Sequence, residues 1–393
     1  MANVSSSNSL EKRPKLRFPG FDEPYKQCRI GDIYAERSQR GASNMELLSV
    51  TMNDGVKPRS EIEGKDNSSE DKSNYKIVRK GDMVYNSMRM WQGANGISPC
   101  DGIVSPAYTV LMPKQEINNG YFAALFKSVT LINEFRKNSQ GMTSDTWNLK
   151  YPQIETIKVQ IPSVSEQDKV SEMFSVLDER IAAQSQLVES LKKYKRGLLM
   201  HYFSDDKTQL WTQCSVSQIG KVITGSTPPT NDRSNYDGDL LFCAPGDVGE
   251  QKYISSTEKR VSPKGFALGR PLPPNSVIVT CIGLIGKLGI AKTSMITNQQ
   301  INALVVSEGI DHEFIYYAFE NFFPEYRSKV SMQTLPILSK SEFEKLMIKV
   351  PDLDVQHKIS SHLAAMDRRI EHTQQELNAL IEHRRGIMQQ LFI

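Results

Sequence analysis

The chain has 393 residues, of which 39% are hydrophobic and 24% are charged, and its formal net charge is +3. This length predicts two or three domains that each bury a core, and the composition excludes a chain that is disordered throughout. The sequence has no apolar run of about 18 residues, and its first segment, MANVSSSNSLEKRPK, lacks the apolar centre of a signal peptide. We therefore expect a cytoplasmic protein that does not contact a membrane.

The first domain is expected at residues 17–160, after a flexible N-terminal segment at residues 1–16. Its short β-type runs are separated by glycine, proline and asparagine, which predicts an α+β fold. Residues 53–75 contain almost no apolar side chain and predict a mobile surface loop. Residues 85–96, YNSMRMWQGANG, place amide and guanidinium groups among aromatic residues and glycines. Such groups read base edges in the major groove of DNA, so this segment is a candidate DNA contact.

A long helix is predicted within residues 161–207. It follows an alternation of apolar residues at Ile157, Val159 and Ile161 that is typical of a half-buried strand. Beyond Pro162 the apolar spacing alternates between four and three residues, which is the period of a coiled coil, over about 38 residues. The apolar seam of this helix consists of Val170, Phe174, Leu177, Ile181, Val188 and Leu191.

A second α+β domain is expected at residues 208–348 and a second helix at residues 349–393. The runs SVIVT and NALVV in this domain predict strands. Residues 350–392 match residues 161–203 at a constant offset of 189, with 12 of 43 pairs identical, so the chain contains a tandem duplication. The second seam consists of Ile359, Leu363, Met366, Ile370, Leu377 and Leu380.

Polar residues interrupt both seams at equivalent layers. Gln184 is equivalent to Thr373, and Lys195 is equivalent to Arg384. Polar residues at seam positions set the register of a coiled coil at some cost in stability. The two helices are therefore expected to pack against each other in one defined register.

Motifs for catalysis are missing or incomplete. The segment CIGLIGKLG at residues 281–289 lacks the first glycine and the final serine or threonine of a phosphate-binding loop, and it predicts a tight glycine turn between strands. The double-proline sites TPPT and LPPN lack the residues with which an adenine methyltransferase holds a flipped base. Asp54 and the sequence Glu63-Gly64-Lys65 have the spacing of a magnesium site, but chance explains them better because they lie in a polar loop.

Metal ligation is not expected either. The five cysteines form no C-x-x-C pair, and the nearest two are Cys214 and Cys243. Four of the six histidines are spread around the last helix, where a solvated face is expected: His357, His362, His372 and His383. We thus expect no catalytic residue and no metal ligand.

Loops with the chemistry of base recognition occur in both domains. In the second domain they include residues 224–238, TGSTPPTNDRSNYDG, and residues 298–302, NQQIN. An ordinary solvated turn is the alternative for any one of these loops, and their occurrence in two different domains favours DNA contact. The candidate DNA contacts are Asn86, Arg89, Gln92, Asn95, Gln140, Thr143, Thr227, Asn231, Arg233, Tyr236, Lys287, Gln299 and Gln300.

Several segments resemble the specificity subunits of type I restriction-modification systems. They are LRFPGF, GDMVYNSMRMWQG, DGIVSPAYTVL, TGSTPPT, ITNQQINALVV and the P-x-x-x-x-Q start of each helix, and they are spread over nearly the whole chain. The resemblance implies an α+β fold in which two target recognition domains are separated by two long conserved helices, packed as an antiparallel coiled coil. Tyr25 departs from the family, which often has tryptophan at this position.

The resemblance also implies function and partners. Each recognition domain would read one half of a bipartite asymmetric target in double-stranded DNA, and the helices would set the spacer. Two modification subunits would use S-adenosylmethionine to methylate adenine at N6, and two restriction subunits would use ATP and Mg for translocation and cleavage. The chain itself would bind no cofactor and would not be an enzyme by itself.

Two alternatives stay open. The first is a coiled-coil adaptor that joins two protein-binding domains without touching DNA, and salt-sensitive DNA binding would separate it from a DNA reader. The second is a self-sufficient methyltransferase, which the missing motifs disfavour. A cofactor-binding titration of the purified chain would test that second alternative.

Overall fold

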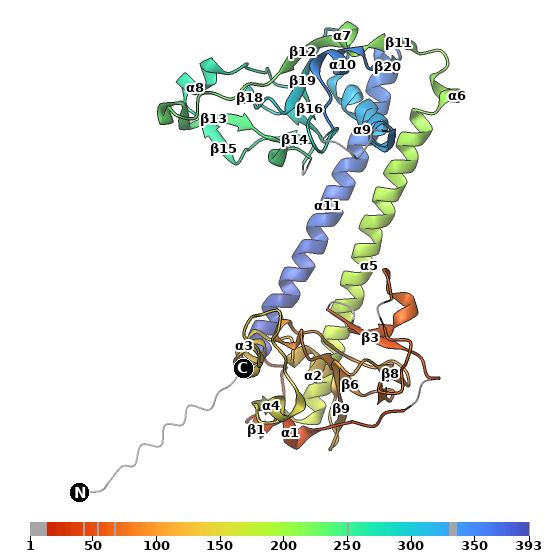
Figure 1. Ribbon diagram of the computed structural model, residues 1–393, viewed down its shortest axis with the longest axis vertical. Coiled ribbons are helices and arrows are strands. Elements are labelled where there is room, and N and C mark those ends of the chain that lie inside the picture. The colour runs from red at the N-terminus through yellow and green to blue at the C-terminus, as the bar shows by residue number, and fades with distance from the viewer. Residues whose placement is uncertain are drawn as a thin grey trace, which may run out of the picture. The chain divides into compact units, whose positions relative to one another are not determined.

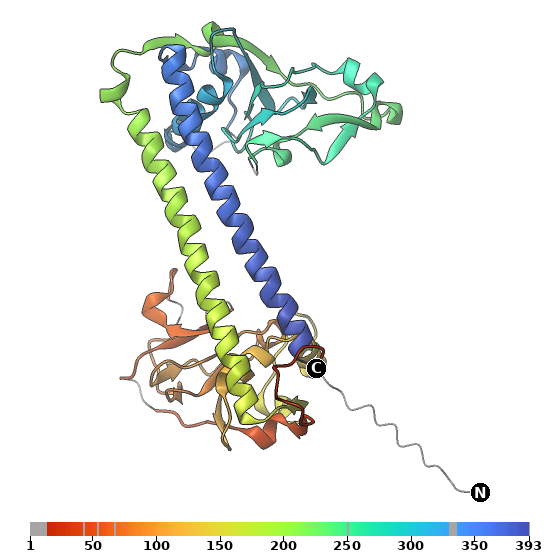
Figure 2. The same ribbon diagram turned by 180° about the vertical axis from the view of Figure 1, so that it is seen from behind.

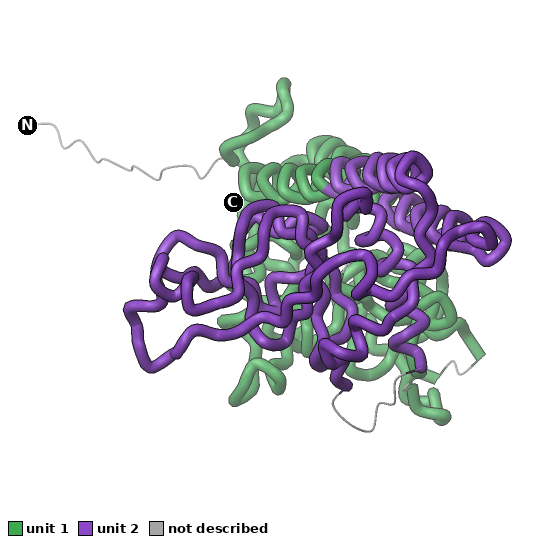
Figure 3. Tube along the Cα trace, turned by 90° about the horizontal axis from the view of Figure 1, so that it is seen from above, with its two compact units in different colours: residues 1–185, 375–393 green, residues 186–374 purple. Residues whose placement is uncertain are grey.

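The computed structural model describes residues 14–41, 44–52, 55–66, 68–249, 251–329 and 336–392. The predicted flexible segment lies, up to residue 13, outside the described residues. The chain divides into two compact units, which Figure 3 colours separately: unit 1 is residues 1–185 with 375–393, and unit 2 is residues 186–374. Each unit contains one recognition domain and one half of each long helix.

The two predicted helices are confirmed. They are α5 (Val164–Tyr202) and α11 (Leu353–Leu391), each of 39 residues. In unit 1, Asp178 and Gln184 of α5 bind Arg384 and Glu376 of α11, and this order of partners shows that the helices run antiparallel (Figure 1, Figure 2). In unit 2, Lys195 and Tyr202 of α5 bind Asp367 and His362 of α11 in the same antiparallel sense.

The seam residues lie between the paired helices or against the domains. In unit 1, Val170 and Phe174 are buried and Leu177 and Ile181 are half-buried. In unit 2, the most deeply buried seam residue is Leu363, which is 0% exposed. Also buried are Val188, Leu191, Ile359 and Met366 in unit 2 and Leu377 in unit 1, and also half-buried are Ile370 in unit 2 and Leu380 in unit 1.

Unit 1 is built on an antiparallel four-stranded sheet with the strand order β2-β9-β6-β7. Its strands are β2 (Tyr34–Glu36), β9 (Tyr108–Pro113), β6 (Met83–Asn86) and β7 (Asn95–Ile97). Three two-stranded ribbons accompany the sheet: β1 (Lys26–Arg29) with β10 (Lys158–Ile161), β3 (Leu48–Thr51) with β4 (Gly55–Pro58), and β5 (Lys76–Val78) with β8 (Gly102–Val104). Short helices connect these strands: α1 (Ile30–Ile33), η1 (Arg59–Glu61), η2 (Met90–Gln92), α2 (Asn119–Leu125), α3 (Val129–Asn138) and α4 (Tyr151–Ile154).

The prediction of a mobile loop over residues 53–75 was wrong for part of that segment. Residues 55–58 form strand β4, which pairs with β3 in antiparallel register. Val56 is the reason, because its side chain is 5% exposed and packs in a core cluster with Leu48 and Val50. A single buried apolar residue therefore anchors strand β4, which the polar composition of the segment did not predict. Asp54 lies outside the described residues.

Unit 2 repeats this arrangement with additions. Its larger sheet has the order β12-β19-β16-β17-β14, formed by β12 (Gly220–Thr224), β19 (Ile301–Val306), β16 (Val277–Thr280), β17 (Leu288–Ala291) and β14 (Tyr253–Ile254). A ribbon pairs β11 (Thr212–Ser215) with β20 (Met347–Val350), and a second sheet contains β15 (Lys259–Val261), β13 (Tyr236–Cys243) and β18 (Met295–Thr297). The helices of the unit are α6 (Asp205–Thr208), α7 (Val216–Ile219), η3 (Arg233–Asn235), η4 (Pro245–Asp247), α8 (Pro263–Leu268), α9 (His312–Lys329) and α10 (Lys340–Lys345).

The duplication extends beyond the helices into the domains. Strands β2-β9-β6-β7 of unit 1 and β12-β19-β16-β17 of unit 2 occur in the same order. Each domain opens with a strand and a short helix, and each closes with a short helix and a strand that pairs with the opening one. The predicted strands at SVIVT and NALVV are β16 and β19, and both are confirmed. The two domains therefore share a topology that their dissimilar sequences did not predict.

A repeated glutamine fixes each domain on its long helix. The Gln167 side chain accepts a hydrogen bond from the Asn118 backbone N–H (3.0 Å) and donates one to the Pro162 carbonyl (3.0 Å). In unit 2, Gln356 accepts from the Asp311 N–H (2.9 Å) and donates to the Pro351 carbonyl (2.9 Å). The P-x-x-x-x-Q sequence at each helix start therefore joins three elements in both units. Among the described residues, no helix is long and apolar enough to cross a membrane.

Candidate nucleic-acid interface

In unit 1 the turn between β6 and β7 presents two of the candidate contacts. Arg89 precedes η2 and is half-buried, and Gln92 at the end of η2 is exposed. Asn86 shapes this turn, because its Oδ1 accepts a hydrogen bond from the Met88 N–H (3.0 Å). The prediction for Asn95 is corrected: its side chain is 0% exposed and its Nδ2 donates to the Gly93 carbonyl (3.0 Å), so it holds the turn from inside.

A hairpin at residues 140–148 presents two further candidates, Gln140 and Thr143, which are both exposed. The backbones of Gln140 and Asn148 exchange two hydrogen bonds of 3.0 and 2.8 Å. Gly141 lies in the left-handed region (φ +145°), where a Cβ would meet the Thr146 carbonyl oxygen at 2.6 Å. A glycine is therefore required for the hairpin to close.

The turn and the hairpin are locked together. The Leu149 N–H donates to the Ser87 carbonyl (2.8 Å), and the Trp147 ring meets the Trp91 ring edge-on at 5.2 Å. The Arg136 guanidinium lies 5.5 Å from the centre of the Trp91 ring, a cation–π arrangement. The structure thus brings together two loops that are 50 residues apart in sequence and that both hold candidate contacts. Trp91, Trp147 and Arg136 could not be predicted as one cluster from the sequence, since no spacing links them.

In unit 2, Thr227 and Gln299 are brought together. The Thr227 hydroxyl donates to Oε1 of Gln299 at 2.6 Å, and both side chains are exposed. Tyr236 is half-buried and its hydroxyl donates to the Pro228 carbonyl (2.6 Å), so it supports the loop. Asn231 and Arg233 lie exposed on the same loop.

The charge around this loop is partly balanced. Hydrogen bonds from Lys264 and Ser234, with the Lys264 charge, lower the pKa of Asp232 to about 2. Asp232 is therefore ionised at neutral pH, next to Arg233. A polyanion would meet a loop in which Lys264 already offsets the nearest carboxylate.

Gln300 and Lys287 are less exposed than most of the other candidate contacts of unit 2. The Gln300 side chain is half-buried and accepts a hydrogen bond from the Asn298 amide (3.1 Å), which closes a turn. Lys287 is half-buried at the end of the turn between β16 and β17. That turn confirms the prediction of a tight glycine turn, because Gly283 and Gly286 have φ of +75° and +78°. The Thr280 hydroxyl accepts from the Lys287 N–H (3.0 Å) and donates to the Leu284 carbonyl.

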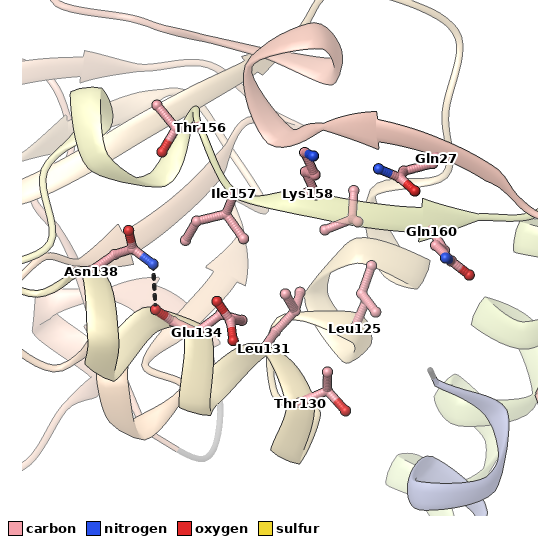
Figure 4. Close-up of a pocket in the computed structure, with 11 residues that line it drawn as sticks. Gln27, Leu125, Thr130, Leu131, Glu134, Asn138, Thr156, Ile157, Lys158 and Gln160 are labelled. Atoms are coloured by element: carbon pink, nitrogen blue, oxygen red, sulfur yellow. Dashed lines mark hydrogen bonds between the residues drawn. The ribbon is translucent and has the colours of Figure 1, made fainter. Parts of the chain in front are cut away.

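A groove of about 580 Å³ in unit 1 lies between α3 and strand β10 (Figure 4). Glu134 and Lys158 are its charged residues, and the amide of Asn138 donates to the Glu134 carbonyl (2.8 Å). The lining contains no histidine or cysteine, and the neighbouring residues are Gln27, Leu125, Thr130, Leu131, Thr156, Ile157, Val159 and Gln160. Its lining therefore lacks the thiol and imidazole groups of a cysteine nucleophile or a zinc site.

Reactive groups are not evident elsewhere in the described part of the chain. Burial raises the pKa of Cys243 to about 12 and that of Cys281 to about 11, so both are protonated thiols at neutral pH. No group of three potential metal-ligating side chains occurs among the described residues. The four histidines of α11 are exposed, as predicted.

These features define a class: a duplicated α+β protein whose polar surface loops are mounted on an antiparallel helix pair. The model of the type I restriction modification DNA specificity domain matches residues 23–193 and again residues 209–383. The chain therefore belongs to the family of type I restriction-modification specificity subunits.

Similar proteins agree with this assignment. The MjaIX specificity subunit of Methanocaldococcus jannaschii is 30% identical over 178 residues, which are 44% of this chain and 41% of that protein. The HindI specificity subunit of Haemophilus influenzae is 20% identical over 361 residues, 71% of this chain and 79% of that protein. The crystal structure of the S subunit from M. genitalium covers 97% of this chain and 99% of its own with a TM-score of 0.62. Its identity is 15%, so this likeness shows the fold alone.

Proposed function

We propose that this chain is the DNA-reading component of a type I restriction-modification complex. Each recognition domain reads one half of a bipartite asymmetric target in double-stranded DNA, and the helices set the spacer. The observation that supports this most is that two domains of one topology present chemically different loops. A shared topology presents both surfaces in the same way, and different loops select different bases.

Catalysis belongs to the partners in this proposal. Modification subunits supply S-adenosylmethionine and transfer methyl groups to adenine N6, and restriction subunits supply ATP-dependent translocation and cleavage with Mg. The thiols of Cys243 and Cys281 are buried and protonated. The chain contributes binding surfaces rather than reacting groups.

Two modification subunits dock on the repeated helices. The duplication places one ion pair twice: Asp178 with Arg384 in unit 1, and the equivalent Asp367 with Lys195 in unit 2. A surface that occurs twice favours a partner that binds twice.

The test is binding of the chain, purified with its modification partner, to duplex DNA at rising salt. We expect the logarithm of the binding constant to fall linearly with the logarithm of salt concentration, and one sequence to be preferred over scrambled duplexes. The adaptor alternative expects no binding to either duplex. Mass measurement should give two modification subunits per chain, and a one-to-one complex would contradict the docking proposal.

A further inference from the structure

Apolar side chains stand exposed on the two interlocked loops of each domain. In unit 1 they are Met88 on the β6–β7 turn, 39% exposed, and Met142 near the tip of the hairpin, 100% exposed. In unit 2 they are Leu284 on the β16–β17 turn, 69% exposed, and Ile337 on the segment before α10, 59% exposed. An exposed Met or Leu is unremarkable when single, but these four lie on the same pair of loops in two domains.

The loops are equivalent by topology and by hydrogen bonding. The β6–β7 and β16–β17 turns join the same two neighbouring strands of the common sheet. In unit 1 the Leu149 N–H donates to the Ser87 carbonyl, and in unit 2 the Leu338 N–H donates to the Cys281 carbonyl, both at 2.8 Å. The sequences of the loops differ, whereas the interlock and the exposed apolar residues are kept.

The described parts of the loops are held by side-chain contacts and bordered by cations. In unit 1 the Trp91 and Trp147 rings support both loops, with Arg136 over Trp91. In unit 2 the Arg327 guanidinium donates to the carbonyls of Ile285 and Gly286 at 3.2 and 3.3 Å. Arg136 and Arg327 are both exposed, and so is Asp145, the one acidic residue of the unit 1 hairpin. Exposed arginines beside these apolar residues can bind the phosphates that border a DNA groove, which favours DNA as the occupant.

We propose that Met142 in unit 1 and Leu284 in unit 2 pack against thymine methyl groups in the major groove, one in each half of the target. The inference rests on the proposed function, in which adenine is the methylated base, so that a recognised adenine has a thymine opposite it. The thymine C5 methyl is the one apolar group on a major-groove edge of the unmodified bases. Met88 and Ile337 border these contacts.

The test combines a protein change with a DNA change, on the full chain complexed with its modification partner and on a duplex holding its mapped target. Deoxyuridine in place of thymidine removes only the C5 methyl. At one thymine in each half-site, this replacement should weaken binding by about fourfold, the effect of one buried methyl group. Met142→Ser should abolish that dependence in the first half-site and Leu284→Ser in the second, while Met142→Leu should keep it.

A matched control is Leu210→Ser, because Leu210 is 99% exposed on the segment between α6 and β11. It should leave both deoxyuridine effects intact. The salt dependence of binding should be the same in all variants, since no phosphate contact changes. Insensitivity of the unsubstituted complex to deoxyuridine, or additive effects of Met142→Ser and deoxyuridine, would overturn the inference.

Two further outcomes separate this inference from its premise. If the complex shows no sequence preference for any duplex, the proposed function fails first. If Met142→Ser or Leu284→Ser releases the modification subunit, the tips bind protein rather than DNA, and this inference alone fails.

Discussion

The two units attach equivalent domains to equivalent helices with different balances of apolar and ionic contacts. In unit 1 an ion pair joins Arg17 to Glu166 of α5 (2.8 Å), and Phe392, just after α11, stacks on Phe174 at 5.8 Å and meets Tyr121 edge-on at 5.5 Å. In unit 2 an aromatic contact of Phe203 with Phe314 (5.6 Å) is accompanied by an ionic network: the Lys195 ammonium lies 2.8 Å from Glu320 of α9 and 2.6 Å from Asp367 of α11. After the duplication, the backbone topology and the hydrogen bonds between the paired loops are the same in both units. The side-chain contacts that join each domain to the long helices, here called the joints, have diverged.

The ionic joint of unit 2 continues into its recognition domain. The Tyr317 hydroxyl donates to Asp367 (2.5 Å), and Lys252 binds both Glu313 (2.7 Å) and the Tyr317 hydroxyl (2.9 Å). Burial alone would lower the pKa of Lys195, but the charges of Glu320 and Asp367 outweigh it and raise that pKa. Lys195 is therefore a charged residue held almost out of water, with its side chain 11% exposed.

The largest expected effect comes from breaking this joint. Lys195→Met leaves Glu320 and Asp367 facing each other with their countercharge removed, and breaking a buried pair in this way costs about 3–5 kcal/mol. The matched change is Arg384→Met, which removes the equivalent pair in unit 1, where Asp178 is 54% exposed. An exposed pair of this kind is worth about 0–1 kcal/mol. Hydrogen exchange resolved by unit would measure both, and equal losses would show that the joints do not differ.

The apolar joint gives the next effect. Phe392→Ala removes a ring that is 6% exposed and packed in the core of unit 1, at a cost of about 3 kcal/mol. Its repeat counterpart, Phe203, is half-buried against Trp211 and Phe314, so Phe203→Ala should cost less. Exchange protection should fall in unit 1 for the first variant and in unit 2 for the second. A global loss from either variant would contradict two separate joints.

Recognition of each DNA half-site should depend on one unit only. Arg89→Ala should weaken binding to the first half-site by about 1–3 kcal/mol, the value of a bidentate base contact, and leave the second half-site unchanged. Arg233→Ala should do the reverse. Affinity measured on duplexes with one half-site scrambled at a time would show this. Uniform weakening on all duplexes, with a smaller salt dependence, would instead assign these arginines to phosphates.

The smallest effect is the contribution of Tyr317 in unit 2 to the loss of stability at alkaline pH. Burial and the charge of Asp367 raise the pKa of Tyr317, which also faces Glu313, Glu320, Lys195 and Lys252. A raised pKa in the folded state contributes stability below the unfolded pKa of about 10 and loses it as pH rises further. Tyr317→Phe should thus remove about 0.4 kcal/mol of the alkaline loss by pH 10. An unchanged alkaline slope would show that Tyr317 does not titrate with unfolding.

The helices could be predicted from sequence because a coiled coil has one period and the duplication showed it twice. The turns of the recognition domains could not be predicted, because their partners are distant in sequence: Trp91 meets Trp147, and Ser87 binds Leu149. Asn95 illustrates the limit most clearly, since composition placed it among base-reading residues and packing placed it inside the turn. The common topology of the two domains could not be predicted from the sequence either. The order of strands in a sheet depends on which strands pair, and residue identity alone does not determine this pairing.

In the proposed function, each unit reads its own half of a bipartite DNA target. The most direct test is a genome-wide map of N6-methyladenine in cells with and without this chain, alongside its modification partner. We expect one asymmetric motif with an unspecified spacer of fixed length, methylated only when the chain is present, and Arg89→Ala should relax only one of its halves. A continuous motif, or a map that does not change when the chain is removed, would contradict it.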